Sequence, residues 1–354
     1  MTESLRKTPL HAAHLALAAR MGPFAGWDMP IRYADGQIAE HLAVRSAAGA
    51  FDVSHMGQIE TSGPDAAALL ARLASNDIAA IPIGGAQYGL LLNEDGGVLD
   101  DVIDYRLEGE RFLTVTNAAT HARDVDWFRS HADGFDAEVT DRAGDYAMIA
   151  VQGPLSREIV QAIANAPLPE RMTIAPRTIN GAEALVAATG YTGEDGVEIL
   201  VAPDDAPAIW NAVLRRGAKP AGLAARDTLR TEACFHLYGN DLSADRGPIE
   251  AGLGWACRRG DGYIGSAAVE LARANPPAEA LVPFVVLDRG AARPGDRPLI
   301  GGVVTSGTFS PSLDRGIGLA YLPRGSAVAG TEFEIDVRGK TRRARVEERP
   351  LLKV

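Results

Sequence analysis

Two adjacent acids stand inside a stretch that otherwise has the composition of a buried strand. The stretch is "NEDGGVLDDVIDY", residues 93–105, and the acids are Asp100 and Asp101. Side chains alternate between the two faces of a strand, so we expect Asp101 to share its face with the apolar Leu99 and Ile103. Asp100 then lies on the opposite face. The two carboxylates point in opposite directions and are not a catalytic dyad.

The neighbours of each acid indicate what it can do. A carboxylate among apolar side chains is desolvated, which raises its pKa, and an acid that handles protons needs such a pKa. Asp101 fits this description, although it could equally accept hydrogen bonds from a turn or pair with an arginine. Asp100 shares its face with Asp104. We therefore expect Asp100 to face water or a backbone partner and to serve stability.

A glycine-rich stretch, "ATGYTGEDGVEI" at residues 188–199, predicts a hairpin whose tip approaches another group closely. Tyr191 is held between turn residues at this tip, and Glu198 stands between two apolar residues where the strand resumes. A ligand site and an ordinary hairpin turn both explain the pattern.

Two arginines in "AGLAARDTLRTEACFHLYG", residues 221–239, lie one helical turn apart. Arg226 and Arg230 therefore share a face, where they could hold an anionic ligand through bidentate contacts. Asp227 and Glu232 offer the alternative, which is a pair of structural salt bridges.

The stretch "FDVSHMGQIE", residues 51–60, places a serine and a histidine side by side. Neighbours in sequence are not a nucleophile and its base in space, so Ser54 and His55 do not predict covalent catalysis. A turn at a strand end in the core is the favoured explanation of His55. Met56 offers a soft surface for a flat ring.

Composition excludes several classes of function. The net charge of −11 argues against a nucleic-acid-binding protein. No GxGxxG pattern follows a predicted strand, and the chain has no P-loop, GxSxG or HExxH pattern. Its two cysteines form no CxxC, so we expect no nicotinamide, flavin or metal. No run approaches the roughly 20 apolar residues of a membrane helix, and no signal peptide is recognisable. We therefore expect a cytoplasmic protein.

Local patterns predict an α+β body followed by an all-β C-terminal domain. Helices are expected at residues 9–22, entered at Pro9 and stopped by Gly22, and at residues 64–82, 121–132 and 154–165, with two more within 204–239. A β-meander is expected at 86–118, a strand at 145–154 and a hairpin at 182–203. Short β-like runs dominate from about Leu281, after a linker at 273–280.

Taken together, these stretches resemble a known family. "TPLHAAHLALAARMGPFAGWDMPIRY", "AVRSAAGAFDVSHMGQIE", "NEDGGVLDDVIDY", "TGYTGEDGVEI", "AGLAARDTLRTEACFHLYGNDL" and "TSGTFSPSLDRGIGLAYL" look like the aminomethyltransferase, or T-protein, family of the glycine cleavage system. Their order and spacing match from about residue 8 to residue 350, which is nearly the whole chain.

The resemblance implies a fold and a domain division. The expected fold is a three-domain α+β cloverleaf around a central folate site, with two discontinuous α+β domains and a β-barrel-like C-terminal domain. The implied boundaries are 1–55 plus 140–245 for the first domain, 56–139 plus 246–278 for the second, and 279–354 for the third.

The resemblance also implies a reaction. The family transfers the methylene carbon of an aminomethyl group, carried on the dihydrolipoyl arm of the lipoylated H-protein, to tetrahydrofolate. The products are 5,10-methylenetetrahydrofolate and ammonia. Tetrahydrofolate is thus the expected co-substrate and H-protein the expected partner, with neither nucleic acid nor membrane involved. The expected location is the bacterial cytoplasm, or the mitochondrial matrix in a eukaryote.

The family's functional residues carry over by motif. The second acid of the "GGxxDD" stretch, Asp101, is the implied catalytic residue. The motifs "TGYTGEDGxE" and "ARD" imply folate contacts by Tyr191, Glu198 and Arg226. The same resemblance adds Met56, Tyr88, Val115, Asn117 and Trp255 to the folate site. Family members often continue into a longer tail, whereas this chain stops at "RPLLKV", so no C-terminal residue is carried over.

Two alternatives belong to the same superfamily. One is a tetrahydrofolate-dependent demethylase, which the residues alone do not separate from an aminomethyltransferase. The folate-binding half of a sarcosine or dimethylglycine dehydrogenase would require a flavin domain. The other alternative is a non-enzymatic folate-binding protein of the iron–sulfur assembly type. That group carries a "KGCYxGQE"-like stretch, and this chain reads "TLRTEACFHLYGND" in the comparable place.

Overall fold

The computed structural model describes residues 4–353, and they form two compact units. The first unit consists of Met1–Leu69, Ala79–Gln87 and Ile103–Arg226, and the second of Leu70–Ile78, Tyr88–Val102 and Asp227–Val354. The three-domain boundaries implied by the family resemblance divide the chain differently and stay a prediction.

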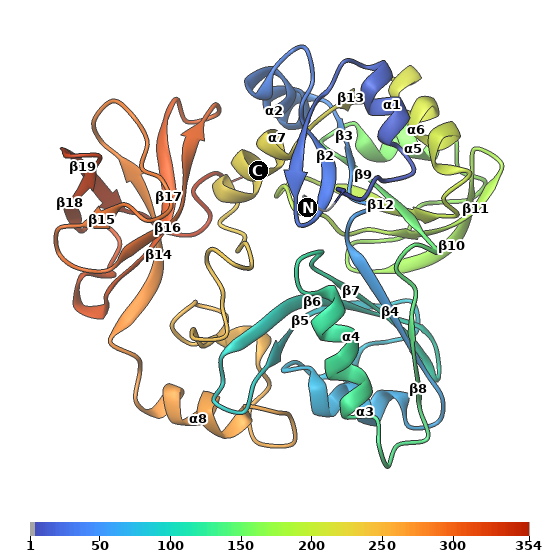
Figure 1. Ribbon diagram of the computed structural model, residues 1–354, viewed down its shortest axis with the longest axis horizontal. Coiled ribbons are helices and arrows are strands. Elements are labelled where there is room, and N and C mark those ends of the chain that lie inside the picture. Colours follow the sequence, from blue (N-terminus) through green and yellow to red (C-terminus); the bar gives the residue numbers. More distant parts are fainter. Residues whose placement is uncertain (1–3, 354) are drawn as a thin grey trace. The chain divides into compact units, whose positions relative to one another are not determined.

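The main sheet of the first unit has six strands (Figure 1). In spatial order they are β10 (Ile174–Ile179), β11 (Ala182–Ala187), β12 (Gly196–Val201), β9 (Ala147–Gln152), β3 (Gly49–Asp52) and β13 (Lys219–Pro220). Helices α5 (Ser156–Gln161) and α6 (Ala206–Arg215) contribute to one apolar core with this sheet. In α6, the buried Ile209, Trp210 and Val213 recur at helical spacing, so one face of the helix is covered.

A second sheet has the strand order β5 (Ala86–Leu92), β6 (Val98–Glu108), β7 (Arg111–Thr116), β4 (Gly57–Ser62) and β8 (Glu138–Asp141). The predicted meander is therefore confirmed as β5, β6 and β7. Helix α4 (His121–Ser130) buries Val125 and Phe128, and it confirms the helix expected at 121–132. The first unit also contains a short hairpin of β1 (Arg20–Phe24) and β2 (Trp27–Arg32), and helix α2 (Gln37–Ser46).

The helix predicted for residues 9–22 is much shorter than expected. Helix α1 covers only His11–Ala16, and the chain then turns through Ala18 at a φ of 52° into β1. Leu15 and Leu17 are exposed, so this part of the apolar pattern does not form a buried helix face. Gly22 does not stop a helix. A Cβ there would lie 2.9 Å from Ile31 Cγ1, so glycine is required for close packing across the β1–β2 hairpin.

Two further predicted helices are also shorter than their apolar patterns. The expected helix at 64–82 becomes α3 (Ala66–Leu73) and a single 3-10 turn, η1 (Ile78–Ala80). The helix expected at 154–165 is reduced to α5. The hairpin expected at 182–203 is confirmed as β11 and β12, whose antiparallel register pairs Ala187 with Glu198. Both helices expected within 204–239 are confirmed as α6 and α7 (Leu223–Glu232).

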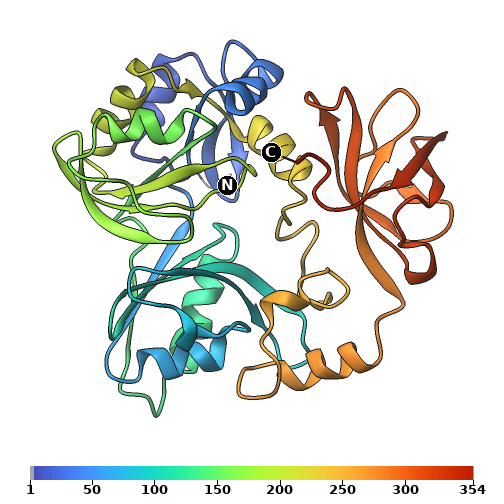
Figure 2. The same ribbon diagram turned by 180° about the vertical axis from the view of Figure 1, so that it is seen from behind.

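The second unit contains a curled six-stranded sheet, drawn in orange and red from opposite sides in Figures 1 and 2. In spatial order its strands are β15 (Arg297–Pro298), β18 (Glu332–Val337), β19 (Lys340–Val346), β14 (Glu279–Val286), β17 (Arg315–Pro323) and β16 (Val303–Ser310). In β18, Phe333 and Ile335 are buried and alternate with exposed acids, as a strand with one covered face requires. The predicted all-β C-terminal segment is confirmed.

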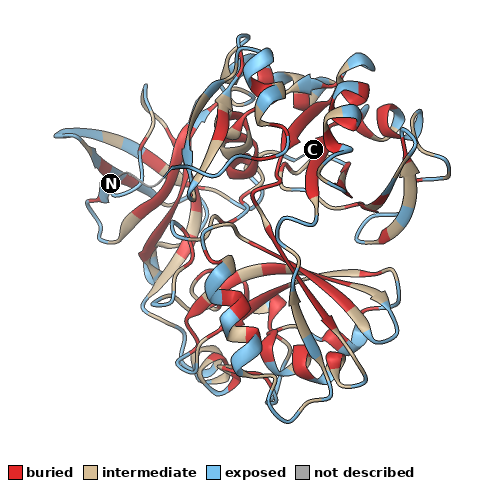
Figure 3. Ribbon diagram, turned by 45° about the vertical axis from the view of Figure 1, so that its right-hand side comes forward, coloured by how far each residue is buried: buried red, intermediate tan, exposed pale blue. Residues whose placement is uncertain are grey.

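A separate apolar cluster of the second unit surrounds the start of β6. It joins Leu90, Leu92 and Val98 to Leu242, Leu253 and other residues of the segment that leads to helix α8 (Ser266–Ala274). Figure 3 colours the buried residues of the described chain in red. Both cysteines are buried and unpaired. Among residues 4–353, no helix combines the length and apolar character needed to cross a membrane.

Candidate functional site

Strand β6 presents Asp101 half-buried in the second unit, next to two aromatic side chains. The hydroxyl of Tyr88 donates a hydrogen bond to Asp101 Oδ2 over 3.2 Å. The ring of Tyr88 stacks on Trp255, with centroids 5.5 Å apart and planes inclined by 25°. Trp255 lies on the 3-10 turn η2 (Gly254–Ala256) and is 67% exposed, so its indole is open to a ligand. The second unit therefore brings together three of the predicted site residues.

The burial of the acid pair is the reverse of the expectation. The alternation is confirmed, because Asp100 is fully buried while its neighbour Asp101 is half-buried. Of the two surroundings predicted for Asp100, water and a backbone partner, the first is wrong. Its face also carries Val98, which packs in the apolar cluster at the start of β6, so Asp100 is drawn into the interior. Burial alone thus does not single out Asp101, whose candidacy rests on the Tyr88 contact and the family resemblance.

A third acid of β6, Asp104, has a raised pKa. Asp104 is buried, and burial raises its pKa to about 6, while a 2.6 Å hydrogen bond from Thr114 Oγ1 on β7 acts in the opposite direction. Asp104 has no role in the site predicted from the sequence, and its hydrogen bond ties two neighbouring strands together.

In the first unit, the glycine-rich hairpin and the start of α7 bring three predicted residues together. The guanidinium of Arg226 lies over the ring of Tyr191, 4.5 Å from its centroid. Burial lowers the pKa of Arg226, and the charge of Glu198 opposes that shift. Among the described residues, Arg226 Nη1 is buried without a hydrogen-bond partner. A buried donor without a partner is costly, which makes Arg226 Nη1 a candidate for a hydrogen bond to a ligand.

His55 lies within electrostatic reach of Arg226. It is buried in the turn between β3 and β4, as one of the two sequence readings expected, and Phe24 packs edge-on against its ring at 5.4 Å. Burial lowers its pKa to about 4, and Arg226 adds to that effect, so the imidazole is neutral at pH 7. Its Nδ1 is another buried atom without a hydrogen-bond partner among the described residues.

The strand register explains how Met56 and Asn117 come together. β4 and β7 are antiparallel, and Gly57 pairs with Thr116, so the residues just beyond this pair lie at the same end of the two strands. Those residues are Met56, which is half-buried, and Asn117. Val115 pairs with Gln58 in the same ladder and is buried.

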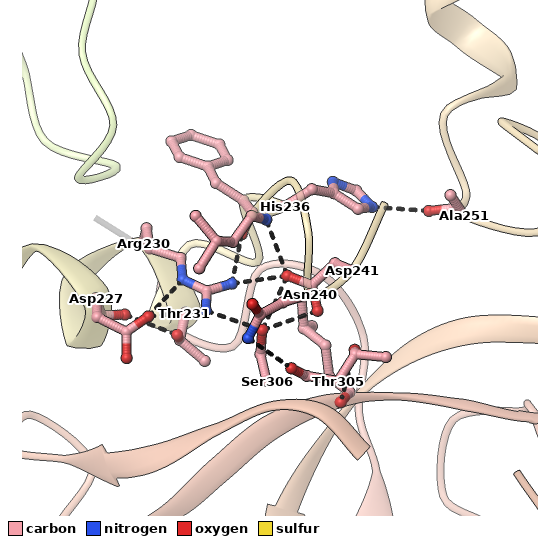
Figure 4. A network of polar contacts seen from close by, with 12 residues as sticks. Asp227, Arg230, Thr231, His236, Asn240, Asp241, Ala251, Thr305 and Ser306 are labelled. Atoms are coloured by element: carbon pink, nitrogen blue, oxygen red, sulfur yellow. Dashed lines mark hydrogen bonds and ion pairs between the residues drawn. The ribbon is translucent and has the colours of Figure 1, made fainter. Parts of the chain in front are cut away.

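Arg230, one turn after Arg226, has a different environment, shown in Figure 4. Its guanidinium bonds Asp227 Oδ1 at 2.8 and 2.9 Å, Asp241 Oδ2 at 2.8 Å and Ser306 Oγ at 2.8 Å. The side chain is only 2% exposed. Of the two readings of the arginine pair, the structural salt bridge holds for Arg230. Glu232 does not take part in it; its carboxylate accepts hydrogen bonds from Ser310 and Ser312 instead.

Sequence reasoning missed the side chains that support Glu198. Thr189 Oγ1 donates to Glu198 Oε2 over 2.6 Å, and Tyr105 bonds the same hydroxyl over 2.8 Å. The available signal was a tyrosine in an apolar strand, because a buried phenol needs a hydrogen-bond partner. The identity of that partner depends on long-range contacts that a strand pattern does not contain.

Each unit by itself presents a carboxylate beside aromatic side chains. In the second unit Asp101 lies next to Tyr88, which stacks on Trp255, and in the first unit the charge of Glu198 acts on Arg226, which lies over Tyr191. Within residues 4–353, no group of three or more metal-ligating side chains is placed to hold a metal ion.

Comparison with known families identifies the class of protein. Residues 10–260 match the GCVT N-terminal domain family, and residues 280–353 match the glycine cleavage T-protein C-terminal barrel domain family. The chain therefore belongs to the glycine cleavage T-protein family. The α+β fold and C-terminal barrel-like domain implied by the sequence resemblance are those of this family.

Relatives agree over nearly the full length. Proteins named aminomethyltransferase include one from Symbiobacterium thermophilum, 43% identical over 99% of this chain and 98% of its own. Another, from Thermus thermophilus, is 43% identical over 95% of this chain and 96% of its own. The crystal structure of the glycine cleavage system aminomethyltransferase T from Bartonella henselae superimposes with a TM-score of 0.93 at 35% identity, covering 99% of both chains.

Proposed function

We propose that this chain is the tetrahydrofolate-dependent aminomethyltransferase of a glycine cleavage system. It takes the aminomethyl group carried on the dihydrolipoyl arm of H-protein and passes the methylene carbon to tetrahydrofolate, which releases ammonia. The observation that carries the proposal is the pairing of Asp101 with the Tyr88 hydroxyl on a strand of a T-protein fold.

Asp101 is the proposed catalytic residue. Nitrogen N5 of tetrahydrofolate attacks the methylene carbon as its bond to the amine breaks, and the proton that N5 sheds leaves with the amine as ammonia. N10 then bonds the same carbon as the C–S bond to the lipoyl arm breaks, and the proton of N10 goes to the released thiolate. A half-buried carboxylate can orient the attacking nitrogen, accept or return the proton and stabilise developing positive charge. The Tyr88 hydroxyl fixes the orientation of that carboxylate through Oδ2. The exposed face of Trp255 offers a flat apolar surface to the reactants.

Glu198, Tyr191 and Arg226 are the proposed folate-holding residues. An ionised carboxylate only accepts hydrogen bonds, which suits the N–H donors along the edge of a pterin. Tyr191 provides an aromatic face, and Arg226 Nη1 provides a donor that has no acceptor among the described residues. Met56, Val115 and Asn117 are proposed to line the same ligand. Holding the two reactants in one orientation supplies much of the rate.

The lipoylated H-protein is the proposed partner. It is the donor that the reaction requires, since the aminomethyl group arrives on a lipoyl arm. We also propose the cytoplasm as the location, in keeping with bacterial relatives and two thiols that form no disulfide.

The test supplies the purified chain with aminomethyl-loaded, lipoylated H-protein and tetrahydrofolate. Ammonia and 5,10-methylenetetrahydrofolate should appear in equal amounts, and omission of tetrahydrofolate should slow ammonia release strongly. A demethylase would instead leave the loaded lipoyl arm intact and transfer methyl groups from an S-methyl or O-methyl donor to the folate. That result would contradict the proposal.

A further inference from the structure

Glu198 is supported by a chain of two hydroxyl groups within the first unit. Thr189, in the loop after β11, donates from Oγ1 to Glu198 Oε2 over 2.6 Å. The phenol of Tyr105 on β6 lies 2.8 Å from the same Thr189 oxygen. The chain therefore links strand β6 to the glycine-rich hairpin that carries Glu198.

The number of available protons fixes which group donates in each of these two hydrogen bonds. An ionised carboxylate can only accept, so the single hydroxyl proton of Thr189 is committed to Glu198. Thr189 can then only accept from the phenol, and Tyr105 must be the donor of the second bond. Burial raises the pKa of Tyr105 above its usual range, and the charge of Glu198 adds to the shift, so the phenol keeps its proton. Two donors in series thus point towards the carboxylate.

The backbone of the same loop is held independently by Gln152 at the end of β9. Gln152 Nε2 donates to the carbonyl oxygen of Thr189 over 3.1 Å, and Thr192 Oγ1 donates to Gln152 Oε1 over 2.9 Å. Tyr191 lies between these two anchor points. A Cβ at Gly190 would come within 1.9 Å of Gln152 Oε1, so the loop closes over this amide only because glycine is there.

The two sets of bonds have separable roles. Since Gln152 already fixes the loop through backbone and Thr192 contacts, the hairpin does not need the Thr189 hydroxyl to hold its shape. The Thr189 hydroxyl instead donates to a carboxylate, and such a charge-assisted hydrogen bond is stronger than one between neutral groups. It engages Oε2, and a carboxylate with two oxygens retains capacity for donors of a ligand.

We propose that Thr189 is a positioning residue for ligand recognition, which holds the Glu198 carboxylate as an oriented acceptor with Tyr105 behind it. The inference rests on the proposed function, because it assigns Glu198 to the folate. It predicts that loss of the Thr189 hydroxyl weakens folate binding through Glu198 alone.

The test measures the dissociation constant for tetrahydrofolate with the full chain, by calorimetric titration under anaerobic conditions. Thr189→Val keeps the shape and removes the donor, and it should weaken binding about tenfold. Thr189→Ser restores the hydroxyl and should bind within about twofold of the wild type. Thr173→Val is the matched control, since the half-buried Thr173 donates only to the Glu170 carbonyl oxygen. It should leave affinity unchanged.

A second set of variants, made in a Glu198→Gln background, separates a positioning role of Thr189 from a general effect on stability. In a Glu198→Gln chain, adding Thr189→Val should cost less than about twofold in affinity, because the residue it serves is already changed. Tyr105→Phe should weaken binding about threefold and show the same loss of effect in that background, which decides the matter if Thr189→Val misfolds.

The outcomes are distinguishable. A wild-type chain that does not bind tetrahydrofolate removes the proposed function together with this inference. A wild-type chain that binds, with Thr189→Val binding equally well, removes the inference alone. An equal tenfold loss in both backgrounds would also overturn it, because Thr189 would then act independently of Glu198.

Discussion

Arg226 and Arg230 lie one turn apart on α7, and each has a buried, neutral histidine near it, yet the two surroundings differ. Arg230 is enclosed by Asp227, Asp241 and Ser306, and the nearby His236 donates from Nε2 to the Ala251 carbonyl oxygen over 2.8 Å (Figure 4). Burial lowers the pKa of His236 to about 4, as it does for His55.

Around Arg226 the protein leaves polar atoms unused. Arg226 Nη1 and His55 Nδ1 are both buried without a hydrogen-bond partner among the described residues. Native proteins pair nearly all buried polar groups, so these two atoms are the observation that supports the proposed ligand contact at Arg226. The comparison teaches that helical spacing assigns residues to a face, whereas partners from distant segments decide whether a charge serves structure or binding.

The largest effect is expected at Arg230. Arg230→Met leaves Asp241 buried without its cation, so the free energy of unfolding should fall by about 3–5 kcal/mol in a urea titration. The control is Arg142→Met, which breaks a half-exposed ion pair with Glu60 and should cost less than about 1 kcal/mol. An equal loss of unfolding free energy in the two variants would contradict the structural role assigned to the Arg230 ion pairs.

The converse is expected at Arg226. Arg226→Gln should reduce tetrahydrofolate affinity about tenfold to a hundredfold, as for loss of a charge-assisted hydrogen bond to a ligand. The free energy of unfolding should fall by only about 1 kcal/mol, the scale of the lost contact with the Tyr191 ring, since Nη1 has no hydrogen-bond partner among the described residues. Calorimetric titration and urea unfolding give the two values. If tetrahydrofolate affinity were unchanged and the free energy of unfolding fell, Arg226 would have a structural role like that of Arg230.

The smallest effect concerns pH. The pKa of His55 is about 4 in the folded state and about 6.5 in the unfolded chain, so the unfolded state takes up its proton first as pH falls. The stability due to a neutral His55 is complete above pH 6.5 and is lost towards pH 4. His55→Gln should therefore reduce the slope of unfolding free energy against pH between 4.5 and 6 by about 1.4 kcal/mol per pH unit.

Asp104 changes stability in the opposite direction over a similar range. Its pKa is raised to about 6, so its contribution is complete below about pH 4 and is lost as pH rises through 6. The His55 comparison is therefore made in an Asp104→Asn background, in which the carboxylate no longer titrates. An unchanged slope in the doubly substituted chain would show that His55 is already protonated in the folded state.

Much of the fold follows from local sequence, and the exceptions have physical causes. The hairpin of β11 and β12 and the all-β character of the C-terminal segment were predictable because turn residues and alternation are local signals. The helix at 9–22 was overextended because Leu15 and Leu17 continue an apolar pattern that remains exposed. Periodicity shows which residues share a face and not whether that face is covered.

The same limit applies to the site. Alternation separated Asp100 from Asp101 correctly, but the buried face proved to be that of Asp100, because the packing of Val98 determines it. Tyr191, Glu198 and Arg226 could be named from motifs of a family. Thr189 could not, since its role depends on a bond to Glu198 and on a phenol 84 residues away in the chain.

The most direct test of the account is single-turnover transfer of the methylene carbon from loaded H-protein to tetrahydrofolate. Asp101→Asn should slow transfer at least about a hundredfold while tetrahydrofolate affinity stays within about threefold. Asp100→Asn, its neighbour on the buried face, should keep transfer within about threefold and lower the free energy of unfolding by about 1–3 kcal/mol. Near-normal transfer by Asp101→Asn would contradict the central claim that this carboxylate handles the proton.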